Sequence, residues 1–140
     1  KSAHFRTIIS GWGHATPADS DGRACAEWCF RTHKIKIDNV NKFSHYMGPI
    51  GCGSNPISNQ AGNWAPDRAG WCPGMVVPIR IDKFDSDISN SNLNFEYYFQ
   101  PWTNNFVGTT GYNNKNAYNA ISSFIILKSD QEIQPATISN

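Results

Sequence analysis

The sequence predicts an all-β fold, an antiparallel sandwich or jelly roll contained in one domain. Short segments in which apolar and polar residues alternate at period two occur along most of the chain. Only two short segments, residues 24–30 and 116–121, are compatible with helices. Residues 48–74 are rich in Pro and Gly, which predicts a long ordered loop. At 140 residues, the chain has the length of a single domain with a core of its own.

The predicted strands are short and end at turn-forming residues. They cover residues 5–10, 33–38, 75–82, 94–100 and 122–128, and residues 131–138 can add one more. Ile35 and Ile37 share one face of the second segment, whereas Pro78 confines the third segment to an edge or a bulge. Residues 122–128 are apolar at consecutive positions, which predicts a strand that is covered on both faces.

The composition is poor in charge. Charged residues make up 16% of the chain, and 12 Lys and Arg stand against 11 Asp and Glu. Because no basic stripe is available to follow phosphates, we expect no nucleic-acid partner. No apolar run approaches the ~18–20 residues that cross a bilayer, so we expect no membrane partner. The polar, uncharged and aromatic-rich composition instead favours neutral ligands that are rich in hydroxyl groups, such as sugars.

The four cysteines are Cys25, Cys29, Cys52 and Cys72. None of them lies in the C-x2-C or C-x2-H knuckle typical of a zinc site. We therefore expect no metal but two disulfides, and a secreted or periplasmic location in an oxidising compartment. Local pairing is favoured, with about 2 kcal/mol for a small 25–29 ring and about 3 kcal/mol for a 52–72 loop, although spacing leaves the other pairings open. The start at Lys1 predicts either a removed leader or a piece of a longer protein.

The segment Cys25–Cys29 places Glu27 and Trp28 inside the smaller ring. A carboxylate there has few rotamers and a partly apolar neighbourhood. These conditions raise the pKa of a carboxylate, or preorganise it to bind a hydroxyl group or a water molecule. The competing interpretation is that Glu27 is an ordinary surface glutamate in a disulfide turn. The local sequence by itself slightly favours this second interpretation.

Residues 63–72 form a second candidate, in which two tryptophans flank Asp67 and Arg68. Indole faces such as that of Trp71 stack on the apolar face of a pyranose, and an arginine donates two hydrogen bonds to a hydroxyl or carbonyl pair. The alternative is a loop that packs its own tryptophans and neutralises Arg68 with Asp67. Residues 11–14, which end at His14, form a third candidate. Two glycines there let the chain turn sharply and present Trp12, although an indole that caps the barrel end fits equally well.

Other catalytic and metal-binding motifs are absent. His14, His33 and His45 occur in no H-x-H or H-E-x-x-H pattern, so we interpret them as ordinary histidines. The sequence also contains no nucleophile elbow, no P-loop and no dinucleotide-binding glycine pattern. Serine hydrolases, P-loop proteins and dinucleotide-dependent enzymes are therefore not supported.

Five longer runs resemble a known family. They are Arg6–Ala15, Cys25–His33, Asn63–Met75, Phe99–Asn105 and Tyr118–Ser129. These runs, rich in Trp, Cys and Pro, resemble the bacterial secreted peptide-N-glycosidase F family over essentially the whole chain, with variation around residues 82–94 and 106–116. The resemblance implies two eight-stranded antiparallel jelly rolls side by side, with the active site in the cleft between them. Residues 1–140 are then expected to be the second, C-terminal jelly roll.

The same resemblance implies an activity and a set of site residues. The family hydrolyses the amide that joins the innermost N-acetylglucosamine of an N-linked glycan to asparagine, and it needs no cofactor. The products are an aspartyl residue and a glycosylamine. Glu27 falls on the family's active-site glutamate, Arg68 on a cleft arginine, and Trp12 and Trp71 on indoles that line the chitobiose site. The resemblance also supports two disulfide pairings, Cys25–Cys29 and Cys52–Cys72.

One residue of the family's site has no counterpart in the chain. The family's essential aspartate, thought to activate the attacking water, belongs to the N-terminal jelly roll. We therefore expect an N-terminal jelly-roll partner, in the same precursor or as a separate chain, and an inactive isolated chain. A large apolar interface with that partner predicts exposed Trp or Ile on one face. Two other classes stay open: a non-catalytic carbohydrate-binding jelly roll, and a copper-dependent monooxygenase-like one, against which the missing H-x-H pair argues.

Overall fold

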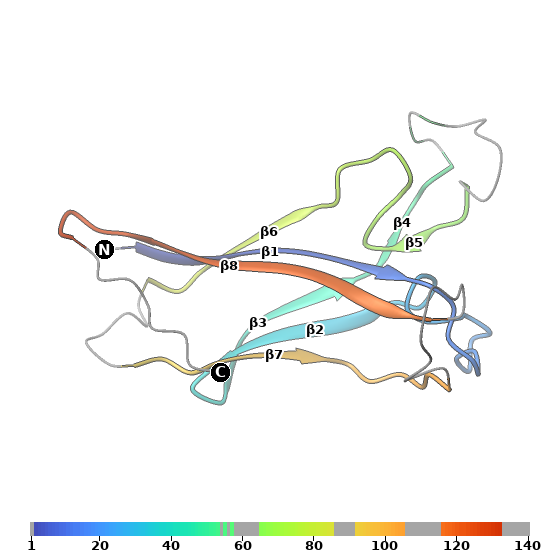
Figure 1. Cartoon of the computed structure of the whole chain (residues 1–140), viewed down its shortest axis with the longest axis horizontal. Coiled ribbons are helices and arrows are strands. Elements are labelled where there is room, and N and C mark those ends of the chain that lie inside the picture. The colour runs from blue at the N-terminus through green and yellow to red at the C-terminus, as the bar shows by residue number, and fades with distance from the viewer. Residues whose placement is uncertain are drawn as a thin grey trace.

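The computed structural model describes residues 2–53, 55, 57, 65–85, 92–105 and 116–132. The strands in these residues are β1 Ser2–Trp12, β2 Arg31–Ile37, β3 Val40–Met47, β4 Pro49–Ile50, β5 Arg68–Ala69, β6 Ile79–Lys83, β7 Phe95–Phe99 and β8 Tyr118–Lys128. They form two layers with strand orders β6-β1-β8 and β3-β2-β7, and β4 pairs with β5 at one end (Figure 1). The pairings of these strands are antiparallel, which confirms the all-β antiparallel prediction.

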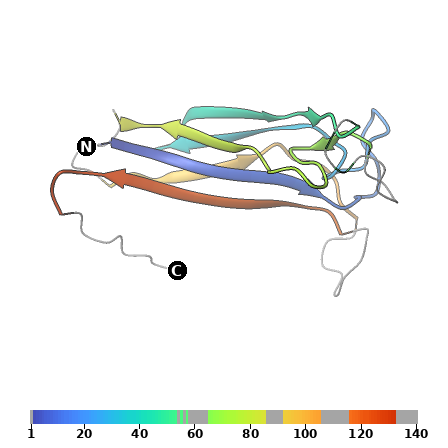
Figure 2. The same ribbon diagram turned by 90° about the horizontal axis from the view of Figure 1, so that it is seen from above.

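The two layers pack through inward-facing side chains that alternate along the strands. β1 buries every second residue from Ala3 to Ile9, and β2 buries Ile35 and Ile37 against the same core. The rings of Phe5 and Phe95 meet edge to face across the layers, with their centroids 4.9 Å apart. Each large apolar side chain buried in this way contributes about 1.5–3 kcal/mol. This shared face therefore holds the layers together. Seen from above, the strands of both layers run along the long axis of the molecule (Figure 2).

β2 and β3 form a hairpin with a two-residue turn. Asp38 and Asn39 both have positive φ, at 49° and 65°. This conformation is typical of a type I′ turn, whose twist matches that of the flanking strands and which Asn and Asp tolerate. The strand predicted at residues 33–38 corresponds to β2, whereas β3 was not predicted. Most side chains of β3 are partly or fully exposed, so the strand lacks a clear apolar alternation.

Neither of the two segments that were compatible with a helix forms one. Residues 24–30 form turns around the Cys25–Cys29 disulfide, and Ala26 makes an isolated β-bridge with His14. In the segment 116–121, residues 118–121 already belong to β8, whose first residue, Tyr118, pairs with Trp12 at the end of β1. The described residues include no helix long and apolar enough to cross a membrane.

Two predicted strands differ at their limits. The strand expected at 75–82 begins only at Ile79, directly after Pro78, because proline has no N–H to donate to a ladder. Of the strand expected at 131–138, residues 131 and 132 lie outside any strand, and the others lie outside the described residues.

The prediction that residues 122–128 are covered on both faces is also wrong. β8 lies at an edge of its sheet, and Phe124 and Ile125, which point to opposite faces, are 56% and 45% exposed. Ile79 and Ile81 of β6 are exposed as well. Ile81 and Phe124 both pair with Arg6 of β1, so they lie on the outward face of one sheet. We call Ile79, Ile81 and Phe124 the outer apolar patch.

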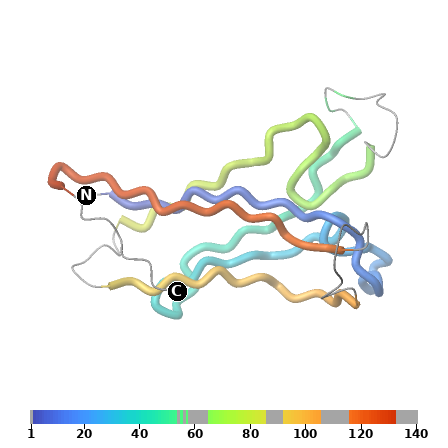
Figure 3. The backbone as a smooth tube through the Cα atoms, in the orientation of Figure 1, coloured from blue at the N-terminus to red at the C-terminus, as the bar shows by residue number. Residues whose placement is uncertain are grey.

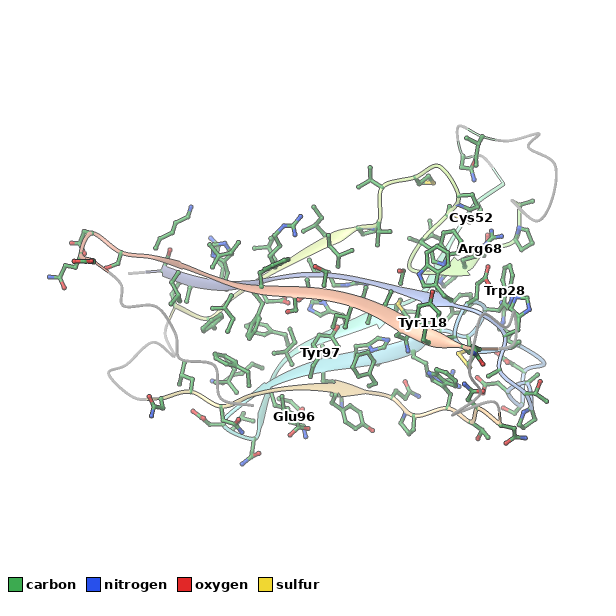
Figure 4. All side chains as sticks on the ribbon, in the orientation of Figure 1. Trp28, Cys52, Arg68, Glu96, Tyr97 and Tyr118 are labelled. Atoms are coloured by element: carbon green, nitrogen blue, oxygen red, sulfur yellow. A yellow bond between two sulfur atoms is a disulfide. The ribbon has the colours of Figure 1, made fainter. Side chains whose placement is uncertain are left out.

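A polar cluster lies between the two layers. The Nε2 atom of His45 on β3 lies 2.7 Å from Oδ2 of Asp82 on β6. His33 is 1% exposed, and neither of its ring nitrogens has a hydrogen-bond partner among the described residues. Burial, reinforced by the charges of Arg80 and His45, lowers the pKa of His33 to about 4. Burial likewise raises the pKa of Tyr97, which lies between the sheets in Figure 4, to about 12.

The pKa of His33 predicts a loss of stability in acid. The unfolded imidazole titrates near ~6.5, above the folded value, so the unfolded state takes up its proton first. The contribution of His33 to the free energy of unfolding should therefore be fully present above pH ~6.5. It should fall by about 3 kcal/mol as the pH drops toward the folded pKa. His33→Phe should flatten this loss, because a phenyl ring cannot bind a proton. Urea unfolding at pH 7 and pH 4.5 measures the effect.

The matched control is Ile35→Val, two positions along the same inward face of β2. It should lower the free energy of unfolding by about 1 kcal/mol at both pH values, because it removes one buried methyl group. If His33→Phe loses as much stability in acid as the wild-type protein, the role assigned to His33 is wrong.

β1 meets the Cys25–Cys29 ring at very close range. A Cβ atom on Gly11 would lie inside 3.0 Å of the carbonyl oxygen of Ala26, which real Cβ atoms essentially never do. A glycine is therefore required at this contact. The strand end and the ring are held in one relative position.

Gly11→Ala should destabilise the fold by about 1–3 kcal/mol, because either the ring or the strand must move to admit the methyl group. Gly53→Ala is the matched control, since a Cβ atom there meets nothing within 4 Å. Thermal unfolding measures both variants. A Tm for Gly11→Ala equal to that of the control would show that the contact is looser than described.

Candidate active site

Glu27 lies on a segment whose backbone is held on both sides. Its N–H donates to the carbonyl oxygen of Gly13 at 3.1 Å, and its own carbonyl oxygen accepts from the N–H of Ala69 at 2.8 Å. The Cys25–Cys29 disulfide closes the ring in which it lies, with the two Cα atoms 4.7 Å apart. Glu27 thus connects the end of β1 to β5, and its side chain starts from a fixed point.

Arg68 is placed by the second disulfide-bonded segment. It belongs to β5 and pairs with Ile50 of β4. The Cys52–Cys72 disulfide joins the residues that follow these two strands, with its Cα atoms 5.4 Å apart. Both disulfide pairings that the resemblance implied are therefore confirmed.

The side chains of Glu27 and Arg68 form an ion pair. Oε1 of Glu27 accepts a hydrogen bond from Nε of Arg68 at 2.8 Å. Oε2 lies 3.4 Å from Nε2 of His14. Arg68 is only 4% exposed and Glu27 14%, so solvent screens the pair weakly and the charge-assisted bond is strong. The carboxylate is thus held in one orientation, with its second oxygen toward His14.

Two indoles flank the guanidinium of Arg68. Its central carbon lies 4.8 Å from a ring centroid of Trp28 and 5.0 Å from that of Trp71. At these distances the negative faces of the indoles attract the cation. Its Nη1 also donates to the carbonyl oxygen of Pro66 at 3.0 Å. Figure 4 shows Arg68 and Trp28 together at the end of the sandwich that also holds Cys52.

Trp12 and Trp71 form a stacked pair beside Arg68. Their ring centroids lie 3.9 Å apart, and the ring planes differ by 18°. Nε1 of Trp71 donates to the carbonyl oxygen of Gly11 at 2.6 Å, and Nε1 of Trp12 donates to Oγ of Ser10 at 2.8 Å. Both indoles are partly exposed, so they present fixed apolar surface at this end of the molecule.

The structure thus brings together the four site residues that the sequence analysis named, which are Glu27, Arg68, Trp12 and Trp71. It adds Trp28 and His14, which belong to two of the candidate segments in the sequence but were not predicted as site residues. Trp28 follows Glu27 directly inside the disulfide ring, and His14 follows the turn that presents Trp12. His33 and His45, which were grouped with His14, lie instead on the strands of the β3-β2-β7 layer.

One group of potential metal ligands occurs among the described residues. Asp19, Cys25 and Cys29 bring their ligand atoms within 4.8 Å of one another. The two sulfur atoms are bonded to each other as a disulfide, and Asp19 forms an ion pair with Arg31. A metal ion would need free thiolates, so these residues do not form a metal centre in the oxidised protein.

The family model described as "Peptide-N-glycosidase F, C terminal" matches residues 1–126. The whole chain is 55% identical over 141 aligned residues to Peptide-N(4)-(N-acetyl-beta-D-glucosaminyl)asparagine amidase F of Elizabethkingia miricola, of which it covers 38%.

Solved structures give the same result. The structure of PNGase F, a glycosylasparaginase from Flavobacterium meningosepticum, is 57% identical with a TM-score of 0.76, and the match covers 89% of this chain and 39% of that one. A 2.2 Å crystal structure of the amidase is 58% identical, with the same TM-score and coverage. The chain therefore spans well under half the length of these relatives. With the family model matched from residue 1 to residue 126, the chain belongs to the peptide-N-glycosidase F family and corresponds to its C-terminal part.

Proposed function

We propose that residues 1–140 form the C-terminal jelly-roll domain of an amidase that removes N-linked glycans from asparagine. The observation that carries this proposal is the 55% identity, over the whole chain, to a relative named as such an amidase. Because the chain covers 38% of that relative, an N-terminal jelly-roll partner completes the proposed enzyme, in the same precursor or as a separate chain. The two disulfides support a secreted or periplasmic location.

The proposed reaction is hydrolysis of an amide. Water adds to the carbonyl carbon of the glycosylated asparagine and the C–N bond breaks. The nitrogen takes up a proton and leaves with the sugar as a glycosylamine, which later loses ammonia. Such a reaction needs an oriented water molecule, stabilisation of the developing oxyanion and a proton for the leaving nitrogen. An aspartate of the partner domain is proposed to activate the water.

The residues of this chain take positioning and electrostatic roles in that reaction. Arg68 holds Oε1 of Glu27, and Oε2, which faces Nε2 of His14 at 3.4 Å, is proposed to orient a sugar hydroxyl group or the water. The charge of Arg68 stabilises negative charge on the carbonyl side. Trp12 and Trp71 supply apolar surface against which the chitobiose core of the glycan stacks.

The outer apolar patch supports a partner domain. Its three residues, Ile79, Ile81 and Phe124, are each about half exposed, at 48%, 51% and 56%. Large apolar side chains grouped on one face mark interaction surfaces, because their exposure to water is unfavourable. Two of the three residues are isoleucines, and exposed Trp or Ile on one face is what an apolar interface with a partner domain predicts.

Substituting Glu27 by Gln in the two-domain protein should lower kcat/KM about 10²- to 10³-fold. Glutamine keeps the shape of the side chain but loses the charge that orients the substrate. Conversion of glycosylated asparagine to aspartate in a glycopeptide, followed by mass spectrometry, measures the activity.

The matched control is Glu96→Gln on β7, an exposed glutamate that pairs with Lys36 and points away from the sandwich in Figure 4. It should keep wild-type activity. Circular dichroism should show both variants folded. Wild-type activity of Glu27→Gln would contradict the catalytic assignment.

A second prediction concerns the chain alone. The isolated 15.6 kDa species should not convert glycosylated asparagine to aspartate, because no residue in it matches the family's water-activating aspartate. Addition of the N-terminal domain should restore activity if the two associate. Intact mass of the native preparation identifies any partner that copurifies. Activity of the chain by itself would show that it holds its own activating acid.

A non-catalytic sugar-binding domain is the second candidate function. The ion pair with Arg68 favours it, because Glu27 is already engaged and can serve recognition alone. This alternative predicts binding of chitobiose without hydrolysis even when the partner domain is present. The same two-domain assay therefore separates the two functions.

A further inference from the structure

A pocket separate from the Glu27 site opens beside Trp102. It has a volume of about 410 Å³, within the range of small-molecule sites. It is lined by Phe99, Gln100, Pro101, Trp102, Asn104, Ala117 and Asn119. These residues come from the end of β7, the segment that follows it, and the start of β8. Figure 3 shows these segments at the same end of the molecule as residues 25–29.

The lining of this pocket suits a neutral, hydroxyl-rich ligand. Among the described residues, its lining contains aromatic and apolar side chains together with three amides and no ionisable side chain. Amides supply donors and acceptors without charge, as hydroxyl groups and N-acetyl groups of sugars require. Trp102 is partly exposed and offers apolar surface for the apolar face of a pyranose.

One atom of the pocket wall lacks a partner. Oδ1 of Asn119 is buried, and it has no hydrogen-bond partner among the described residues. Buried acceptors of this kind are rare, because leaving one unpaired costs free energy. Asn119 lines the pocket, so rotation of its side chain would bring this oxygen to the pocket surface, where a sugar hydroxyl or an amide N–H would supply the missing donor.

The pocket is connected to the Glu27 site by packing. Trp102 packs against the core cluster that contains Cys25 and Cys29, the disulfide that closes the Glu27 ring. Asn119 pairs across the ladder with Gly11, whose carbonyl oxygen binds Nε1 of Trp71. Paired residues on neighbouring strands lie about 5 Å apart. Asn119 in the pocket wall is therefore separated from the residue that binds Trp71 by a single step across the sheet.

From these observations we propose that the Trp102 pocket is a second sugar subsite. It holds a neutral sugar unit of the same glycan, beyond the chitobiose core that contacts Trp12 and Trp71. The proposal rests on the proposed amidase function. The subsite lets the enzyme bind the outer part of the glycan in addition to the sugars next to the bond that it breaks.

The test compares two substrates of the two-domain protein. One is a glycopeptide that carries only chitobiose on its asparagine, and the other carries a full branched N-glycan. Trp102→Phe and Asn119→Ala should each raise KM for the full glycan about tenfold, since each removes part of one contact. KM and kcat for the chitobiose glycopeptide should stay at wild-type values.

Thr103→Ala is the matched control, because Thr103 is exposed next to Trp102 but does not line the pocket. It should act as wild type on both substrates. Asn119→Ala should leave Tm unchanged or raise it, because it removes a buried acceptor that has no partner. Equal losses on both substrates with a lowered Tm would indicate a structural role and overturn the subsite.

Wild-type kinetics of both pocket variants on the full glycan would also overturn the proposal. A wild-type protein that cleaves neither substrate would instead contradict the proposed amidase function, and the subsite with it. The two failures are therefore distinct.

Discussion

The close contact between Gly11 and the carbonyl group of Ala26 determines the geometry of the end of the sandwich that holds Glu27 and Arg68. It leaves no room for a side chain, so β1 and the Cys25–Cys29 ring behave as one rigid piece. Both backbone groups of Glu27 are then used, by Gly13 and by Ala69. The direction of the carboxylate is consequently set by a disulfide-closed turn that is fixed between the end of β1 and β5, and sites held by rigid elements are the more accurately placed.

Arg68 depends on this arrangement for its own stability. A guanidinium that is 4% exposed has lost most of its water, and the loss must be offset by partners inside the protein. The carboxylate of Glu27, two indoles and the carbonyl group of Pro66 provide that compensation. The same contacts hold the charge in place before any ligand arrives. Stability and preorganisation of the site therefore have one physical origin.

The alternation of Ile35 and Ile37 was enough to predict β2, because it reports burial against the other layer. It could not predict β3, whose side chains are mostly exposed, or the turns at residues 24–30, which follow from a disulfide. Glu27 and Arg68 lie 41 positions apart, and nothing local to either indicates their contact. Family resemblance located them. The position of His14 depends on the bridge to Ala26, which leaves no pattern in the sequence.

The strand order also determines when, during folding, the end of the sandwich that holds Glu27 and Arg68 can form. The β2–β3 hairpin closes through a two-residue turn, and such local pairing is fast. β1 instead lies between β6 and β8, and its contact between Thr7 and Ser123 spans 116 positions of the chain. During synthesis β1 therefore emerges long before either neighbour and waits with both edges unpaired, which exposes it to wrong pairing. Of the described strands, β1 is the first to be synthesised, and its sheet is complete only when β8, the last of them, has been made.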